Sequence, residues 1–176
     1  WITALISGTG MRLAEAVGLA IEDIKLEHEY PHLVLQKHPW RPLKTATSGR
    51  LVPLLGASLW AARRIVETQS GPYAFPRYTT EARANANHAC AALNKWLKGH
   101  APEGCVVHSF RHSIRDRLRA VQCPFDIVNQ IGGWSTLGLR KRMAVDTGWI
   151  CCMGGWRERL SELISHNPCS QTPCNV

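Results

Sequence analysis

Apolar side chains recur at helical spacing over several stretches of this chain. The clearest stretch begins at His108 and carries apolar residues at the following helically spaced positions: Phe110, Ile114, Leu118 and Val121. This pattern predicts an amphipathic helix with one packed face. His108 and Arg111 are three residues apart, so we expect them side by side on the other face. That face would present an imidazole and a guanidinium together.

Similar spacing and capping residues predict further helices. The expected ranges are residues 1–30, residues 56–69, a stretch that follows Thr79–Thr80, and a short helix between Pro124 and Gly132–Gly133. Thr9 is expected as an N-cap within the first range, and Thr79–Thr80 caps the third helix. We expect Trp60 in the packed core.

Two short β-prone runs lie between the first two helical ranges. Residues 33–38 and 50–54 are strand-like and flank a segment rich in turn residues, which predicts an antiparallel hairpin with Lys44 at or near its tip. The predicted fold is therefore mainly α with a small antiparallel β-sheet, an α+β fold.

Composition fits a globular protein with an anionic partner. The 176 residues suffice for one domain, and the net charge of +8 favours nucleic acid. No apolar run is long enough for a membrane span. The 7 Cys form no Cys-x-x-Cys pair, so we expect reduced thiols, no zinc site and a cytoplasmic protein. The chain opens on Trp1 rather than Met, so we expect a piece of a longer protein.

Several cations and an indole are candidates for chemistry. Arginine binds phosphate oxygens bidentately, and a Lys or His can protonate a leaving alkoxide. No carboxylate cluster accompanies them, so the set suits metal-free phosphodiester chemistry. Each residue also has an ordinary interpretation, such as an Arg12–Glu15 surface pair. Their joint order along the chain is more informative.

That order appears in four motifs: Thr9-Gly-Met-Arg12-Leu-Ala-Glu15, Leu43-Lys44-Thr with Ser48-Gly-Arg50-Leu-Val-Pro-Leu54, His108-Ser-Phe-Arg111-His112, and Ile131-Gly-Gly-Trp134-Ser135. Together they resemble the catalytic domain of tyrosine recombinases, the phage integrase family. The resemblance covers residues 1–136. It implies a mostly helical fold with a small antiparallel sheet, and site-specific cleavage and rejoining of double-stranded DNA.

The resemblance also implies a role for each motif residue. Arg12 and Arg111 would bind the non-bridging oxygens of the scissile phosphate. Lys44 would protonate the departing 5′ hydroxyl, and His108 would serve in acid–base catalysis. Trp134 lies where many members have His, and its indole N–H would donate to the phosphate.

Other expectations concern the surroundings of the site. Glu15 would brace it, while Arg50 and Arg115 would contact DNA. No cofactor or metal is expected. Members of the family assemble as tetramers on DNA and carry a separate N-terminal DNA-clamping domain, which we expect to be absent here. Because we also expect the C-terminal helix that often docks onto a neighbour to be scrambled, we predict a monomer or a weak associate.

The nucleophilic tyrosine of the family has no counterpart here. It is expected near Met143, but the tyrosines of this chain are Tyr30, Tyr73 and Tyr78. A reading frame shifted between about Trp134 and Arg142 can encode Tyr at this place, which suggests a frameshift, although free codon choice can create such motifs. We therefore expect residues 137–176 to be an aberrant, poorly ordered tail, and the chain to bind DNA without cleaving it.

Two alternatives remain at this point. A type IB topoisomerase uses a similar set of catalytic residues, but the short hairpin and the integrase-like motif around Arg12 argue against it. A non-enzymatic basic DNA-binding module is the other. In that case Arg12 and Arg111 would not converge.

Overall fold

The computed structural model describes residues 1–43 and 48–134. Its helices are α1 (Ile2–Thr9), α2 (Leu13–Val17), η1 (Ile21–Asp23, a 3-10 turn), α3 (Gly56–Thr68), α4 (Ala86–Leu97), α5 (Ser109–Ala120) and α6 (Phe125–Gly132). Its strands are β1 (Ile24–Lys25), β2 (His32–Leu35) and β3 (Arg50–Pro53). The predicted class, mainly helical with a small antiparallel sheet, is confirmed.

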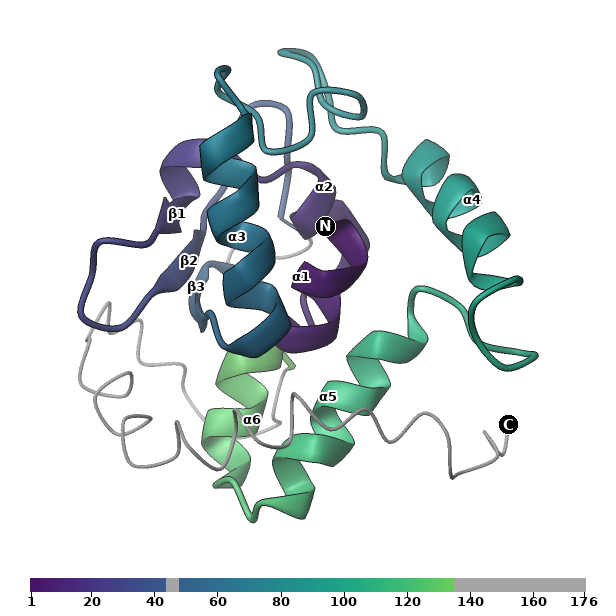
Figure 1. Cartoon of the computed structure of the whole chain (residues 1–176). Helices are drawn as coiled ribbons and strands as arrows, with labels where there is room; N and C mark the ends of the chain where they lie inside the picture. The colour runs from purple at the N-terminus through teal and green to yellow at the C-terminus, as the bar shows by residue number, and fades with distance from the viewer. Residues whose placement is uncertain (44–47, 135–176) are drawn as a thin grey trace.

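The helices pack around α1. In Figure 1, α3 lies in front of α1, the sheet lies on one side, and α5 and α6 lie below. Helix α1 contacts both α3 and α5, while α6 contacts α5 and β3. Leu5 and Ile6 of α1 are fully buried, as are Ile114 and Leu118 of α5. The α5 side of the core therefore follows the predicted apolar spacing.

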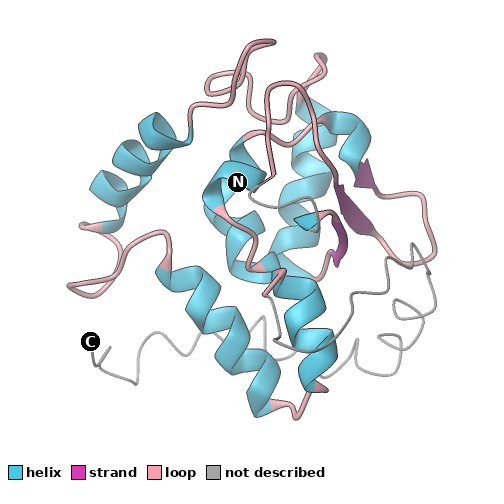
Figure 2. Cartoon of the chain, turned by 180° about the vertical axis from the view of Figure 1, so that it is seen from behind, coloured by secondary structure: helices cyan, strands magenta, loops and turns pink. Residues whose placement is uncertain are grey.

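The sheet has the order β1-β2-β3, with antiparallel pairing throughout. Leu33 pairs with Val52, and Leu35 pairs with Arg50, so the predicted hairpin is confirmed. Strand β1 was not predicted, because two residues are too few for an alternating pattern. Figure 2 shows the sheet from behind, beside α3.

The prediction that residues 1–30 are mainly helical is wrong in detail. Thr9 is the last residue of α1 and not an N-cap, and its hydroxyl donates to the Leu5 carbonyl oxygen. Gly10 then adopts a φ of 62°, a left-handed conformation that favours glycine and ends the helix. Helix α2 begins after Arg12, whose backbone N–H donates to the Glu15 carboxylate over 2.8 Å.

Two other local predictions are corrected. Thr79 does not cap α4, because its hydroxyl donates to the Val17 carbonyl; Asn85 caps the helix by accepting from the His88 backbone N–H. Trp60 is 53% exposed, and α3 instead buries small side chains such as Ala61 and Ala62. Gly133 ends α6 in the left-handed conformation, as predicted.

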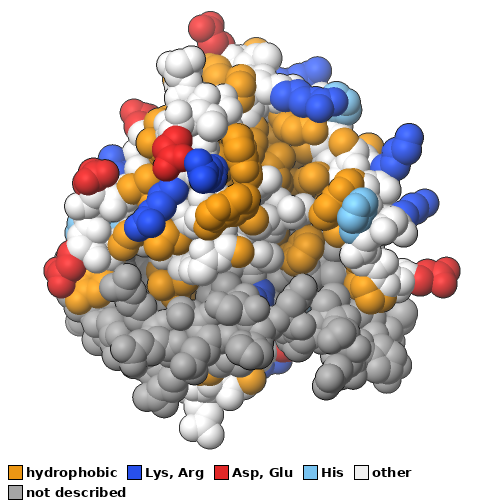
Figure 3. Space-filling view, in the orientation of Figure 1, with side chains coloured by type: hydrophobic (Ala, Val, Ile, Leu, Met, Phe, Trp, Pro, Cys, Tyr) orange, Lys and Arg blue, Asp and Glu red, His pale blue; other side chains and the backbone are white. Residues whose placement is uncertain are grey.

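The face shown in Figure 3 carries apolar side chains over its middle, with Lys and Arg side chains around them. Large exposed apolar side chains include those of Trp1, Trp60 and Trp96. Within residues 1–43 and 48–134, no helix has both the length and the apolar character to cross a membrane.

Candidate active site

The predicted site residues come from separate elements that meet at the C-terminal end of α6. Arg12 precedes α2, Arg50 opens β3, and Arg111 lies in the first turn of α5. Trp134 follows directly after α6. The last carbonyl groups of a helix lack intrahelical partners and carry partial negative charge, so they attract cations.

Arg111 is buried, with 5% of its surface exposed. Its Nη1 donates to the Gly10 carbonyl oxygen and its Nη2 to the Gly132 carbonyl oxygen. Burial, together with the charges of Arg12 and Arg50, lowers the pKa of Arg111 to about 10. The guanidinium therefore remains charged at neutral pH. The apolar spacing placed Arg111 on the face of α5 opposite the packed one, but its side chain is buried.

Arg12 reaches the same helix end. Its Nη2 donates to the Gly133 carbonyl oxygen over 3.5 Å, and its Nη1 pairs with Glu15 Oε1 over 2.8 Å. Arg12 and Arg111 thus donate to the carbonyls of two successive glycines. The convergence that a shared phosphate site requires is present.

Glu15 lies between Arg12 and Arg50. Arg50 Nη2 donates to Glu15 Oε2 over 2.8 Å, and its Nη1 donates to Oε1 over 3.1 Å. Burial alone would raise the pKa of Glu15, but the hydrogen bonds and charge of Arg50, with bonds from Arg12, lower it to about 2. The carboxylate is therefore ionised at any physiological pH.

Arg50 also contacts α6 directly. Its Nε donates to the Ile131 carbonyl oxygen over 2.9 Å, and its side chain is 5% exposed. The sequence assigned Arg50 to DNA contact, and nothing in its local pattern indicated a partner 81 residues away. In the structure its guanidinium is directed into the protein.

Trp134 packs against arginines. The guanidinium carbon of Arg111 lies 4.7 Å from the centre of its ring, and that of Arg115 lies 5.3 Å from it. Both distances lie within cation–π range. The ring covers the backbone of Gly132 so closely that a Cβ there would lie 2.0 Å from it. The indole is therefore placed beside the buried guanidinium of Arg111.

His108 lies at the rim of the same site. It precedes α5 rather than lying within it, its side chain is exposed, and its ring centre is 5.0 Å from that of His112. Partial burial, followed by the charges of His112, Arg111 and Arg12, lowers the pKa of His108. At pH 7 this imidazole is neutral and can accept a proton.

Two predicted positions lie outside the described residues. Lys44 falls in the segment 44–47, and Met143, where the nucleophile is expected, falls in 135–176. Their roles stay predictions.

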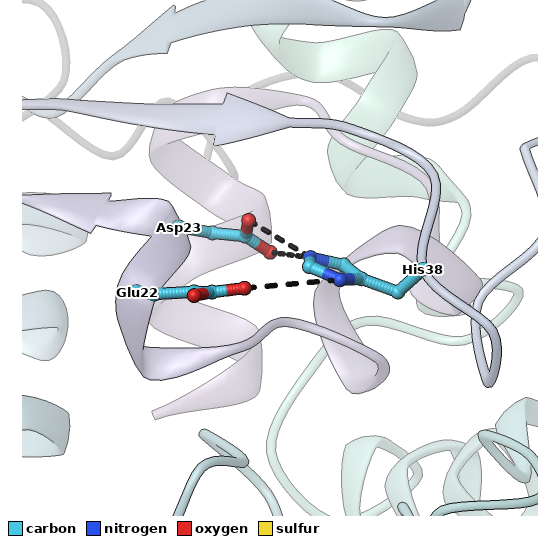
Figure 4. Close-up of side chains that lie close together, drawn as sticks. All are labelled: Glu22, Asp23 and His38. Carbon is cyan, nitrogen blue, oxygen red and sulfur yellow. Dashed lines mark hydrogen bonds and ion pairs between the residues drawn. The ribbon is translucent and has the colours of Figure 1, made fainter.

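A second buried charge cluster joins η1 to the loop after β2 (Figure 4). His38 Nε2 lies 3.0 Å from both carboxylate oxygens of Asp23, and its Nδ1 lies 3.9 Å from Glu22 Oε1. This spacing would suit a metal ion. However, Asp23 also accepts from Arg41 Nη2 over 3.0 Å and from Gln36 Nε2 over 3.1 Å. Its oxygens are already occupied, so the cluster is an internal ion-pair network.

Comparison with known proteins agrees with this geometry. The sequence matches the phage integrase family over residues 1–142, so the chain belongs to that family. No curated protein matches the chain.

Solved structures share the fold. The Tn1549 transposon integrase in complex with transposon right end DNA superposes with a TM-score of 0.54 and 19% identity, over 76% of this chain and 50% of that chain. XerH site-specific recombinase bound to difH substrate gives 0.52 and 19%, over 97% and 43%. XerA recombinase gives 0.54 and 15%, over 87% and 56%. The chain thus spans about half the length of these proteins.

Proposed function

We propose that residues 1–136 are the catalytic domain of a site-specific DNA recombinase that binds the phosphates of double-stranded DNA. The observation that carries this proposal is that Arg12 and Arg111 donate to adjacent carbonyls at the end of α6. Three arginines and one carboxylate meet there, which leaves an excess of positive charge. Such a centre attracts a phosphodiester.

The roles of the individual groups follow from their chemistry. Each guanidinium has five N–H donors, so Arg12 and Arg111 keep donors for non-bridging phosphate oxygens beyond those that bind carbonyls. Their fixed charge would stabilise a pentacoordinate phosphate. His108, neutral at pH 7, is suited to accept or relay a proton. Lys44 would protonate the leaving 5′ oxygen.

The indole of Trp134 would donate its N–H to the phosphate while its ring holds Arg111 in place. Glu15 orients Arg12, and Arg115 would contact DNA next to the site. No step in this scheme requires a metal ion. As a DNA-acting protein, the chain is expected in the cytoplasm of its host.

The chain is expected to bind DNA without cleaving it. The family attacks the phosphate with a tyrosine, and residues 135–176 contain none. We infer that residues 137–176 are a separate tail without the nucleophile segment, and we expect a monomer in solution. The similar Tn1549 integrase is bound to transposon right end DNA and the similar XerH recombinase to difH substrate, which supports duplex DNA as the partner.

Duplex binding tests the proposal directly. Fluorescence anisotropy with a labelled duplex should give an affinity that falls linearly with salt on a double-logarithmic plot. Arg12→Met should weaken binding and reduce the slope by about 1, as expected for one lost phosphate contact. Arg64→Met is the matched control, because Arg64 is exposed and pairs only with Glu67. Equal slopes for both variants would contradict the phosphate role of Arg12.

A suicide duplex tests the missing nucleophile. A nicked substrate traps a covalent protein–DNA adduct when a protein side chain attacks the phosphate. We expect no adduct on a denaturing gel. An adduct at the DNA 3′ end would show that a residue of this chain acts as nucleophile.

A further inference from the structure

Arg50 has more internal contacts than a DNA-contacting arginine needs. Its guanidinium donates to both oxygens of Glu15 and to the carbonyl oxygens of Ile131 and Ser48. Only 5% of its side chain is exposed. To reach a phosphate, Arg50 would have to leave a buried carboxylate without its main partner, which is strongly unfavourable.

These contacts join three parts of the chain that are distant in sequence. Arg50 belongs to β3, Glu15 to α2, and Ile131 to the last turn of α6. The next two carbonyls of that turn, on Gly132 and Gly133, accept from Arg111 and Arg12. Arg50 therefore fixes the helix end on which both phosphate-binding guanidiniums depend.

The backbone at Gly133 accommodates Arg50. Gly133 has a φ of 61°, and a Cβ built there would lie 2.9 Å from Arg50 Nη1. Because Gly133 has no Cβ, the backbone can run close beside the Arg50 guanidinium and continue to Trp134. The position of Trp134 therefore depends on this close approach.

Charge gives Arg50 a second function in the same place. Glu15 binds Arg12 and Arg50 together, so the three groups carry a net positive charge. Without Arg50, Glu15 would neutralise Arg12 alone. Arg50 thereby leaves the charge of Arg12 available for an anion.

We propose that Arg50 is a positioning residue, which holds the end of α6 against Glu15 so that Arg12, Arg111 and Trp134 keep their places. This inference rests on the proposed function, because the residues that Arg50 positions are those proposed to bind the phosphate. It replaces direct DNA contact as the role of Arg50. It is testable in the free protein.

Nuclear magnetic resonance of arginine side chains provides the first measurement, made without DNA. Hydrogen bonds to Gly10 and Gly132 restrict rotation of the Arg111 guanidinium, so its Nη protons should give separate signals. Arg50→Met should merge these signals. Arg117 is the internal control, because its guanidinium donates to Ser7 of α1 and does not depend on α6.

Lysine substitution provides the second measurement. An ammonium is a point charge and cannot span the Glu15 carboxylate and the Ile131 carbonyl as a planar fork does. We expect Arg50→Lys to merge the Arg111 signals as Arg50→Met does, and to weaken duplex binding by about tenfold or more. Arg115→Lys is the matched control and should retain most of the affinity, because a phosphate contact needs mainly the charge.

The outcomes separate the two proposals. Unchanged Arg111 signals in Arg50→Met, or full DNA affinity in Arg50→Lys, would overturn the positioning role. If Arg50→Met also loses the Arg117 signals, the chain has unfolded, and Arg50→Lys decides by the same signals. Failure of the wild-type chain to bind DNA would end the proposed function, while the guanidinium signals would still decide the role of Arg50.

Discussion

Two buried clusters of this protein each combine arginine and a carboxylate, and they differ in charge balance. In the Asp23 cluster, the carboxylate accepts hydrogen bonds from Arg41 and Gln36 and lies 3.0 Å from His38 Nε2, so one buried arginine is matched by one buried carboxylate. At the end of α6, Glu15 pairs with Arg12 and Arg50, and the third arginine, Arg111, donates to backbone carbonyls and lies against the Trp134 ring. The first cluster pairs one buried arginine with one buried carboxylate, whereas the second has three arginines for one carboxylate.

The pKa values reflect the same difference. Burial lowers the pKa of both Arg41 and Arg111, but the nearby charge of Asp23 opposes the shift for Arg41. For Arg111 the charges of Arg12 and Arg50 lower the pKa further, and the charge of Glu15 opposes them only in part. A buried cation beside two other cations and one carboxylate is suited to receive an anion. A buried cation that is matched by a carboxylate, such as Arg41 with Asp23, indicates a role in holding the fold.

The largest expected effect comes from breaking the Asp23 cluster. Asp23→Ala leaves Arg41 buried without its carboxylate, so the free energy of unfolding should fall by about 3–5 kcal/mol. Urea denaturation measures this change. Glu67→Ala removes an exposed partner of Arg64 and should cost at most about 1 kcal/mol. Similar losses for the two variants would mean that burial does not distinguish these pairs.

Acid should affect the second cluster through Glu15. Its pKa is lowered from 4.5 to about 2 on folding, so its contribution, about 3 kcal/mol, is complete above pH 4.5 and is lost as the pH falls toward 2. Glu15→Gln should lack this dependence. Urea denaturation of both proteins between pH 6 and pH 2 should therefore give curves that converge at low pH. Parallel curves would contradict the ion pair.

A smaller effect is expected at the glycine beside Arg50. Gly133→Ala places a Cβ against the guanidinium in a left-handed conformation, so unfolding should become easier by about 1–3 kcal/mol. Gly71→Ala is the control, because a Cβ there meets open space and φ is ordinary. Thermal denaturation compares the two. Equal midpoints would show that the end of α6 relaxes without strain.

The smallest effect sharpens the electrostatic comparison at His108. Its pKa should lie below the ordinary histidine value, and Arg12→Met should raise it, because one of the charges that oppose protonation is removed. Titration of the imidazole signals by nuclear magnetic resonance measures both values. Lys25→Met is the control, because it removes a charge from β1 rather than from the residues around His108. A pKa that responds equally to both variants would contradict local coupling.

Periodicity predicted most of the helices and the β2–β3 hairpin, because the apolar spacing of residues such as Ile114 and Leu118 records burial directly. It misplaced Thr9, because a threonine can cap a helix or lie inside one. Here the Thr9 hydroxyl donates to the Leu5 carbonyl oxygen within α1. It also placed Trp60 in the core, whereas the buried side chains of α3 include Ala61, Ala62 and Ile65. Helical spacing alone does not distinguish which of the neighbouring faces of α3 is buried.

The site was predicted through its motifs rather than through periodicity. The convergence of Arg12 and Arg111 agrees with the motif order. The contact of Arg50 with the Ile131 carbonyl could not be predicted, because backbone carbonyls at the end of α6 have no signature in side-chain identity. The Asp23 cluster was missed for a related reason, since Asp23, His38 and Arg41 are ordinary surface residue types until the loop folds back.

The end of α6 has one more consequence. Its three carbonyls, the arginines they hold and the indole of Trp134 all precede the place where the family's nucleophile is expected. The described part of the proposed phosphate site therefore does not depend on the residues beyond that point. Under the proposed function, a chain without the nucleophile would still bind duplex DNA, and it would compete with active relatives for the same duplex.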